Sequence, residues 1–307
     1  VGKCRYGLMC GEDGMVFDDG VTSCLGENHF LMTTTTGGAA HVLEWLELYH
    51  QTEWPELEVF FTSVTDHWAT MTIGGPDSRK LLAELCDDID LDKDAFKFMD
   101  WRQGTVAGVP ARVFRISFTG ELSYEINVQA NFGMHVWKKL MEHGAKYGIT
   151  PYGTETMHIL RAEKGFIIVG QDTDSTLHPY DLGMGWAVAQ QKPFSFVGKR
   201  GMSREDPTKA NRKQLVGLLT KDPQKVLPEG AQAVADPKQA IPMTMLGHVT
   251  SSYYSATLGR SIAMGTIRGG LDRMGETVYY PMLDGSVVEA EICSPVFYDP
   301  KGDRQNV

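Results

Sequence analysis

Residues 11–20 read Gly11-Glu12-Asp13-Gly14-Met15-Val16-Phe17-Asp18-Asp19-Gly20. The stretch is a polar turn followed by a short apolar run, which predicts a strand that holds Asp18 and Asp19 at its rim. Because adjacent strand residues point to opposite faces, at most one of these carboxylates can face a given pocket. A carboxylate aimed into an apolar cleft can hold or move a proton on a ligand amine. The alternative interpretation is that residues 18–20 form a simple turn.

The composition is that of a soluble globular protein large enough for two or three domains. The chain has 307 residues, of which 42% are hydrophobic and 22% charged, both ordinary values. Its 29 basic and 39 acidic residues give a net charge of −10. Because no dense basic stretch occurs, we expect no nucleic-acid partner. No apolar run approaches the roughly 20 residues that cross a bilayer, and the N-terminus does not resemble a signal peptide, so we expect no membrane partner.

The five cysteines have no metal-binding or disulfide-type spacing. They lie at scattered positions without a C-x-x-C pair: Cys4, Cys10, Cys24, Cys86 and Cys293. An odd, scattered set of this kind is typical of reduced thiols in a cytoplasmic protein. His178 and His248 have no serine or cysteine partner in a triad-like context, so we interpret both as structural and expect no catalytic metal.

The pattern of the first 203 residues predicts mixed helices and strands, an α+β fold. Residues 5–35 indicate a hairpin with a third strand, and residues 109–118 and 122–128 a second hairpin. Strands are also predicted at 58–62 and 69–73. Helical spacing indicates helices over 38–50, from 77 or 78 to 85, over 132–147 and from 150 onward.

The pattern changes after a charged, proline-containing segment at residues 200–213. Short strands separated by turn signals follow at 214–219, 245–249, 261–267, 277–280 and 290–293. This spacing predicts a compact β-barrel or jelly-roll domain over 204–307, with the preceding region ending at 203.

Six short motifs occur in order between residues 5 and 298. They read Arg5-Tyr6-Gly7-Leu8-Met9-Cys10 with 16–21, Phe118-Thr119-Gly120-Glu121 with Tyr124-Glu125, Arg161-Ala162-Glu163-Lys164 with Val169-Gly170-Gln171-Asp172, Phe196-Val197-Gly198-Lys199, Gly247-His248-Val249-Thr250-Ser251, and Leu258-Gly259-Arg260-Ser261-Ile262-Ala263. In this order and spacing they resemble the aminomethyltransferase family, the glycine-cleavage T-protein and its relatives. The resemblance implies T-protein-like folate-binding domains, two interleaved α+β subdomains with antiparallel sheets, followed by the barrel.

Within this family, several segments are most similar to the folate domain of the heterotetrameric sarcosine oxidase α subunit. They are residues 4–9, 33–40, 180–186, 252–255 and 295–300. This resemblance implies that tetrahydrofolate traps the one-carbon unit of sarcosine oxidation as 5,10-methylenetetrahydrofolate, with a flavin-binding β subunit and other subunits as partners. No G-x-G-x-x-G follows a strand, so flavin and NAD are expected only elsewhere in the parent complex. Relatives have a further segment before the equivalent of Tyr6, so we expect a piece of a longer protein, its pocket missing some wall.

The resemblance assigns Asp19 as the catalytic residue, beside N10 of the folate. It assigns the other six candidates to folate binding: Tyr6, Thr34, Phe118, Glu163, Arg212 and Tyr298. Glu163 aligns with the carboxylate that receives two N–H bonds from the pterin edge, and the aromatic residues stack on its flat rings. Thr34 stands for a family asparagine, and Ser23 replaces a family tyrosine. Arg212 aligns with a basic residue that can meet the folate tail.

Each assignment has a plainer alternative. Glu163 could form a surface ion pair with Arg161 or Lys164 at a helix end, and the aromatic residues could belong to the core. Arg212, with Lys209 and Lys213, could lie in a solvated linker.

Three other functions stay open from the sequence. They are a free-standing aminomethyltransferase, the folate-binding module of a dimethylglycine or sarcosine dehydrogenase, and a folate-binding regulatory module without turnover. The change to serine at position 23 argues against the first of these, and retention of both Asp19 and Glu163 argues against the last.

Overall fold

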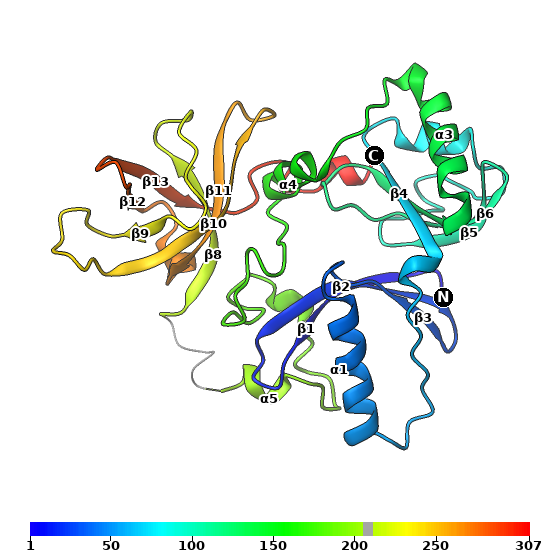
Figure 1. The fold of residues 1–307 in the computed structure, drawn as a ribbon, viewed down its shortest axis with the longest axis horizontal. Helices are drawn as coiled ribbons and strands as arrows, with labels where there is room; N and C mark the ends of the chain where they lie inside the picture. Colours follow the sequence, from blue (N-terminus) through cyan, green and yellow to red (C-terminus); the bar gives the residue numbers. More distant parts are fainter. Residues whose placement is uncertain (205–210) are drawn as a thin grey trace. The chain divides into compact units, whose positions relative to one another are not determined.

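The computed structural model describes residues 1–204 and 211–307. Its chain begins with a three-stranded sheet of order β1-β2-β3, formed by β1 (Cys4–Cys10), β2 (Val16–Gly26) and β3 (His29–Met32) (Figure 1). The helix α1 (Ala39–Thr52) follows. The predicted hairpin, third strand and helix are therefore confirmed. Asp18 and Asp19 lie inside the eleven-residue β2, so the interpretation of residues 18–20 as a turn is wrong.

A four-stranded antiparallel sheet of order β4-β7-β6-β5 comes next. Its strands are β4 (Trp68–Gly74), β5 (Trp101–Val106), β6 (Val109–Phe114) and β7 (Ser123–Gln129). The helices α2 (Ser78–Ala83) and α3 (Gly133–Gly144) contribute apolar residues to the core on one face of this sheet. Alternation along β7 sends Tyr124, Ile126 and Val128 into that core. Glu125 therefore belongs to the opposite face.

Two predictions about this sheet are wrong. Residues 58–62 alternate like a strand but are not one, because no neighbouring strand pairs with them in the described part of the chain. The strand predicted over 109–118 ends at Phe114. The next residue, Arg115, is buried, and its guanidinium donates to the carbonyl oxygens of Phe96 and Gln305, while its backbone bonds to Asp100 and Met99 just before β5.

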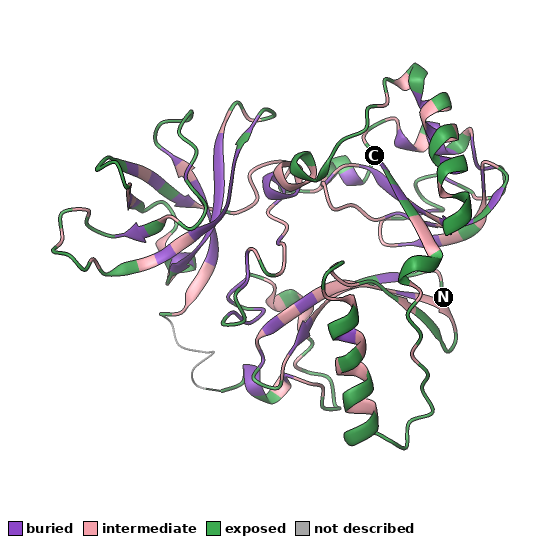
Figure 2. Ribbon diagram, viewed as in Figure 1, coloured by how far each residue is buried: buried purple, intermediate pink, exposed green. Residues whose placement is uncertain are grey.

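The C-terminal region is a closed barrel of order β10-β11-β8-β13-β12-β9, which confirms the barrel prediction. Its strands are β8 (Lys213–Thr220), β9 (Gln232–Val234), β10 (Met245–Ser255), β11 (Arg260–Arg268), β12 (Thr277–Pro281) and β13 (Val287–Cys293). Val216, Leu218 and Ile292 belong to one buried apolar cluster inside the barrel. Its long strands β8, β10 and β11 are buried over most of their length (Figure 2). The three-residue β9 is too short for a periodic signal and was not predicted.

Two helices precede the barrel, α4 (Thr154–Glu163) and α5 (Lys199–Met202). The described chain also has short 3₁₀ helices, named η1 (Thr65–His67), η2 (Ala130–Phe132), η3 (Ala145–Tyr147), η4 (Gly185–Ala187), η5 (Gly270–Arg273) and η6 (Asp303–Gln305). Among the described residues, no helix has the length and apolarity that a bilayer-spanning segment requires.

The chain forms two compact units that interleave in sequence. The first unit comprises Val1–Gly7, Asp18–Tyr152 and Gly302–Val307, and the barrel unit comprises Leu8–Phe17 and Gly153–Lys301. The division by chain order at residue 203 stays a prediction, and the contacts group residues 153–203 with the barrel. Of the predicted linker, residues 205–210, Lys209 among them, lie outside the described residues.

Candidate functional site

The two carboxylates of β2 have different surroundings. Asp18 is 2% exposed; its Oδ1 accepts hydrogen bonds from the backbone amides of Asp19 (2.8 Å) and Thr35 (3.1 Å), and its Oδ2 accepts one from Thr35 Oγ1 (3.1 Å). A Cβ at Gly38 would lie 1.8 Å from Asp18 Oδ2, so this position needs glycine. Asp18 therefore anchors the turn that leads into α1.

Asp19 is directed to β1 instead. The Tyr6 hydroxyl donates to Asp19 Oδ2 at 2.7 Å, and Oδ1 has no hydrogen-bond partner among the described residues. Burial raises the pKa of Asp19, the Tyr6 hydrogen bond opposes that rise, and the charge of Asp18 adds to it. Burial and the Asp19 charge raise the pKa of Tyr6, so Tyr6 stays a donor. The structure thus brings Tyr6 and Asp19 together, as two of the seven candidates.

Thr34 and Phe118 also belong to the first unit. Thr34 follows the end of β3, where its Oγ1 donates to the Thr35 carbonyl oxygen at 2.8 Å. The next residue in the chain, Thr35, is the one whose hydroxyl donates to Asp18. Phe118 is half-buried in the connection between β6 and β7. Their contacts with a folate stay predictions.

Glu125 on β7 is a candidate that the sequence reasoning missed. It lies opposite Thr72 of β4 and Phe114 of β6, is half-buried and has no hydrogen-bond or ion-pair partner in the described part of the chain. Burial raises its pKa to about 7. A signal was present in the sequence, because Glu125 immediately follows Tyr124 in the second motif. Side chains alternate between the two faces of a strand, so Glu125 points away from the core that Tyr124 enters.

Glu163 lies at the C-terminal end of α4 in the barrel unit and is 4% exposed. Its Oε1 accepts a hydrogen bond from Ser255 Oγ at 2.6 Å. Its carbonyl oxygen accepts the backbone amides of Phe297 (3.0 Å) and Tyr298 (2.9 Å). The structure therefore brings Glu163 and Tyr298 together.

The alternative interpretation of Glu163 as a surface ion pair is wrong, because both cations pair elsewhere. Lys164 Nζ contacts the Asp299 carboxylate at 3.0 Å. Arg161 is fully buried and pairs with the fully buried Asp172.

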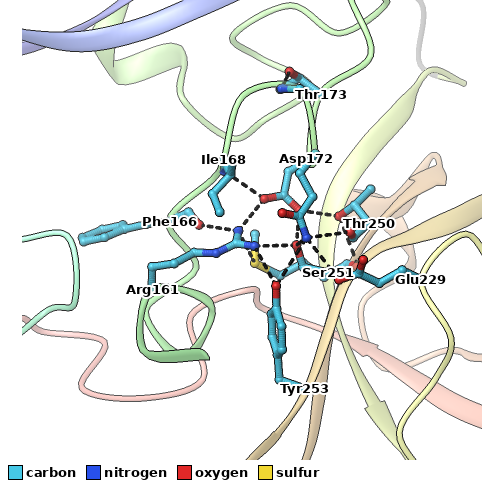
Figure 3. A network of polar contacts seen from close by, with 12 residues as sticks. Arg161, Phe166, Ile168, Asp172, Thr173, Glu229, Thr250, Ser251 and Tyr253 are labelled. Atoms are coloured by element: carbon cyan, nitrogen blue, oxygen red, sulfur yellow. Dashed lines mark hydrogen bonds and ion pairs between the residues drawn. The ribbon is translucent and has the colours of Figure 1, made fainter. Parts of the chain in front are cut away.

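Arg161 and Asp172 lie at the centre of a polar network between α4 and β10 (Figure 3). The Arg161 guanidinium also donates to Ser251 Oγ at 2.6 Å. Asp172 accepts the hydroxyls of Thr250 and Ser251 and the amide of Ile168. These contacts attach the third and fifth motifs to one another, and their arrangement fits a structural role.

Arg212 is held by protein groups. Its Nε and Nη2 contact Asp181 Oδ2 at 3.0 and 2.8 Å, and Nη2 donates to the Thr176 carbonyl oxygen at 2.6 Å. The side chain is 14% exposed, so the solvated-linker interpretation is wrong for Arg212. A contact with the folate tail stays a prediction. His178 is 2% exposed and accepts the backbone amides of Tyr180 and Asp181 on Nδ1.

Two family models match nearly the whole chain. Residues 1–192 match the GCVT N-terminal domain, and residues 213–299 match the glycine cleavage T-protein C-terminal barrel domain. The chain belongs to the glycine-cleavage T-protein family. Both the recognised family and the α+β-plus-barrel fold class predicted from the sequence are therefore confirmed.

Relatives within the T-protein family include two kinds of enzyme. Sarcosine oxidase subunit alpha of Corynebacterium sp. (strain P-1) is 51% identical over all of this chain, which spans 32% of that relative's length. The aminomethyltransferase of Halothermothrix orenii is 31% identical over 90% of this chain and 73% of its own length. Among solved structures, aminomethyltransferase T of Bartonella henselae superposes with a TM-score of 0.81 over 97% of this chain and 76% of its own, at 20% identity. This last likeness shows the shared fold.

Proposed function

We propose that this chain is the tetrahydrofolate-binding part of a sarcosine oxidase α subunit and takes part in trapping the one-carbon unit from sarcosine. The observation that carries the proposal is the Asp19 carboxylate, with one oxygen held by Tyr6 and the other without a partner among the described residues. The 51% identity to a sarcosine oxidase α subunit along the entire chain favours this branch of the family.

The open carboxylate oxygens of the first unit suit a ligand rich in N–H groups. Asp19 Oδ1 and both oxygens of Glu125 have no partner among the described residues, and a carboxylate in this state binds N–H donors strongly. Tetrahydrofolate supplies the two nitrogens that accept the one-carbon unit. Asp19 would orient a reacting amine and hold or move a proton at Oδ1, and its burial strengthens the interaction with a developing positive charge.

Two carboxylates compete for the pterin edge. The family resemblance favours Glu163, and the structure adds Glu125. Oε1 of Glu163 already accepts a hydrogen bond from Ser255. Glu125 has no partner in the part of the chain that the structure describes, and burial raises its pKa to about 7. We assign tetrahydrofolate binding to one of these two residues, and the following titration distinguishes them.

The test is a calorimetric titration of the chain with tetrahydrofolate, carried out on the wild type and on Glu163→Gln, Glu125→Gln and Asp19→Asn. The exposed Glu47→Gln on α1 is the matched control. We expect micromolar binding that weakens about tenfold or more in one of the two glutamine variants, since hydrogen bonds to a charged group are worth about 1.5–3 kcal/mol. Glu47→Gln should bind like the wild type. No binding by a folded wild-type chain would contradict the proposal.

The second measurement separates the enzyme from a binding module. The full-length α subunit, assembled with its flavin-binding partner, is supplied with sarcosine and tetrahydrofolate, and 5,10-methylenetetrahydrofolate is measured. Asp19→Asn should retain tetrahydrofolate binding within a few-fold and lose most of the transfer. If the wild type binds tetrahydrofolate but forms 5,10-methylenetetrahydrofolate no faster than a reaction without the α subunit, and Asp19→Asn changes neither result, the regulatory-module interpretation is favoured instead.

Copurification tests the branch of the family. The α-subunit proposal predicts a flavoprotein partner that copurifies with the full-length protein, and a free-standing aminomethyltransferase predicts none. The flavin and NAD of the parent complex are proposed to lie outside this chain.

A further inference from the structure

Tyr6 and Asp19 form a contact between two neighbouring strands of the first sheet. Tyr6 lies on β1 and Asp19 on the adjacent β2, and the hydroxyl donates to Asp19 Oδ2 at 2.7 Å. From the sequence, Tyr6 was expected to offer its aromatic face to the pterin. In the structure its hydroxyl is already engaged with the carboxylate proposed to act on the ligand.

The backbone that carries Asp19 is held from its other side. The amide of Asp19 donates to Asp18 Oδ1 at 2.8 Å, and the same oxygen accepts the amide of Thr35 at 3.1 Å. A Cβ at Gly20 would lie 1.8 Å from the carbonyl oxygen of Thr33, so the chain passes very close to β2 immediately after the carboxylate pair. Protein contacts therefore restrain both the main chain and the side chain of Asp19.

We propose that Tyr6 is a positioning residue for Asp19: its hydroxyl holds Oδ2 so that Oδ1 alone is presented to the ligand amine. This inference rests on the proposed function, because it takes Asp19 as the carboxylate that meets the ligand. Tyr6 then acts through Asp19. One fixed oxygen leaves the carboxyl group little freedom to rotate, which favours a single approach geometry for the amine.

The same hydrogen bond sets the protonation state of Asp19. Two ionisable groups act on this carboxyl: Tyr6 from β1 and Asp18 from its own strand. Burial and the negative charge of Asp18 favour the protonated acid, and the Tyr6 hydrogen bond favours the carboxylate. Without the hydroxyl, Asp19 would stay protonated to a higher pH and would accept a proton less readily.

Tyr6→Phe is the variant that tests this role, because it keeps the aromatic ring and removes only the hydroxyl. The control is Tyr254→Phe, which removes the hydroxyl of a tyrosine that is 41% exposed on β10. The first readout is the ¹³C NMR titration of the Asp19 carboxyl carbon in the chain without ligand, assigned by its disappearance in Asp19→Asn. We expect the titration midpoint to move to higher pH in Tyr6→Phe and to stay at the wild-type value in Tyr254→Phe.

The second readout is a double-mutant cycle on methylenetetrahydrofolate formation by the full-length enzyme. Tyr6→Phe should lower the rate about tenfold when Asp19 is present and should have no further effect in Asp19→Asn, because the hydroxyl acts only through that carboxylate. An unchanged NMR midpoint overturns the proposal, and so does an equal loss in both backgrounds. The NMR readout needs no folate, so it can support the Tyr6 role even if the wild-type chain fails to bind tetrahydrofolate.

Discussion

Arg161→Met should destabilise the barrel unit by about 3–5 kcal/mol, because it leaves the Asp172 carboxylate buried without its cation. Both side chains are 0% exposed, so water cannot replace the lost partner. Asp172 keeps three donors, the hydroxyls of Thr250 and Ser251 and the amide of Ile168. These donors place the expected loss toward the lower end of that range. Methionine has nearly the length of the arginine stem, which keeps the cavity small.

Hydrogen exchange of the β10 amides is the suitable assay. Tryptophan fluorescence reports mainly on the first unit, because Trp186 is the only one of the chain's six tryptophans in the barrel unit. A loss of 3–5 kcal/mol corresponds to roughly 100- to 4,000-fold faster exchange wherever exchange proceeds through opening of this unit.

Two further variants make the result decisive. Lys221→Met breaks an exposed pair with Glu289, whose side chains are 77% and 39% exposed, and should cost less than about 1 kcal/mol. Arg161→Met combined with Asp172→Asn removes both charges and should recover part of the loss. A loss below about 1 kcal/mol in Arg161→Met, or no recovery in the double variant, would refute the buried-charge reasoning.

Three other predictions concern single positions. Because burial raises the native pKa of Glu125 from 4.5 to about 7, the native state binds a proton that the unfolded state releases, and stability falls as the pH rises through this range. Urea unfolding followed by tryptophan fluorescence should therefore show Glu125→Gln more stable than the wild type at pH 8, by at most about 3 kcal/mol, with no difference near pH 4. Lys164→Met should speed amide exchange at Tyr298 by about tenfold or more, since it removes a buried charged hydrogen bond to the neighbouring Asp299; unchanged exchange would show that the Lys164–Asp299 pair does not hold the Tyr298 backbone in place. Gly38→Ala should cost about 1–3 kcal/mol because its Cβ overlaps a carboxylate oxygen, whereas Gly37→Ala, with no atom within 4 Å, should cost under about 0.5 kcal/mol; equal effects in urea unfolding would count against the overlap.

Local periodicity was sufficient to predict most elements but not their partners. The alternation that correctly predicted β4 also predicted a strand at 58–62, which has no neighbour among the described strands. A strand needs hydrogen bonds from an adjacent segment, and a single sequence carries no record of which segment that is. The barrel was predictable because short strands recur between turn signals with little helix, although the three-residue β9 gives no periodic signal.

The candidate site shows the same limit. The period of two predicted that the carboxylates of Asp18 and Asp19 would diverge, and the structure gives them different partners. It could not predict that the Tyr6 hydroxyl meets Asp19, because this depends on the register between β1 and β2. Nor could it predict the Arg212–Asp181 pair, whose members are 31 residues apart.

The satisfied and unsatisfied acids of the chain separate structural from functional roles. Asp18 and Asp172 receive hydrogen-bond donors on both carboxylate oxygens. These hydrogen bonds offset the free-energy cost of burying the two carboxylates. Asp19 and Glu125 are partly buried with oxygens that no described residue binds, which costs stability without any structural return. Proteins keep such destabilising carboxylates at sites where a bound ligand supplies the missing hydrogen-bond donors. Glu163, with one oxygen held by Ser255, lies between these groups, and this is why the titration of Glu125→Gln against Glu163→Gln tests the assignment of the pterin carboxylate so directly.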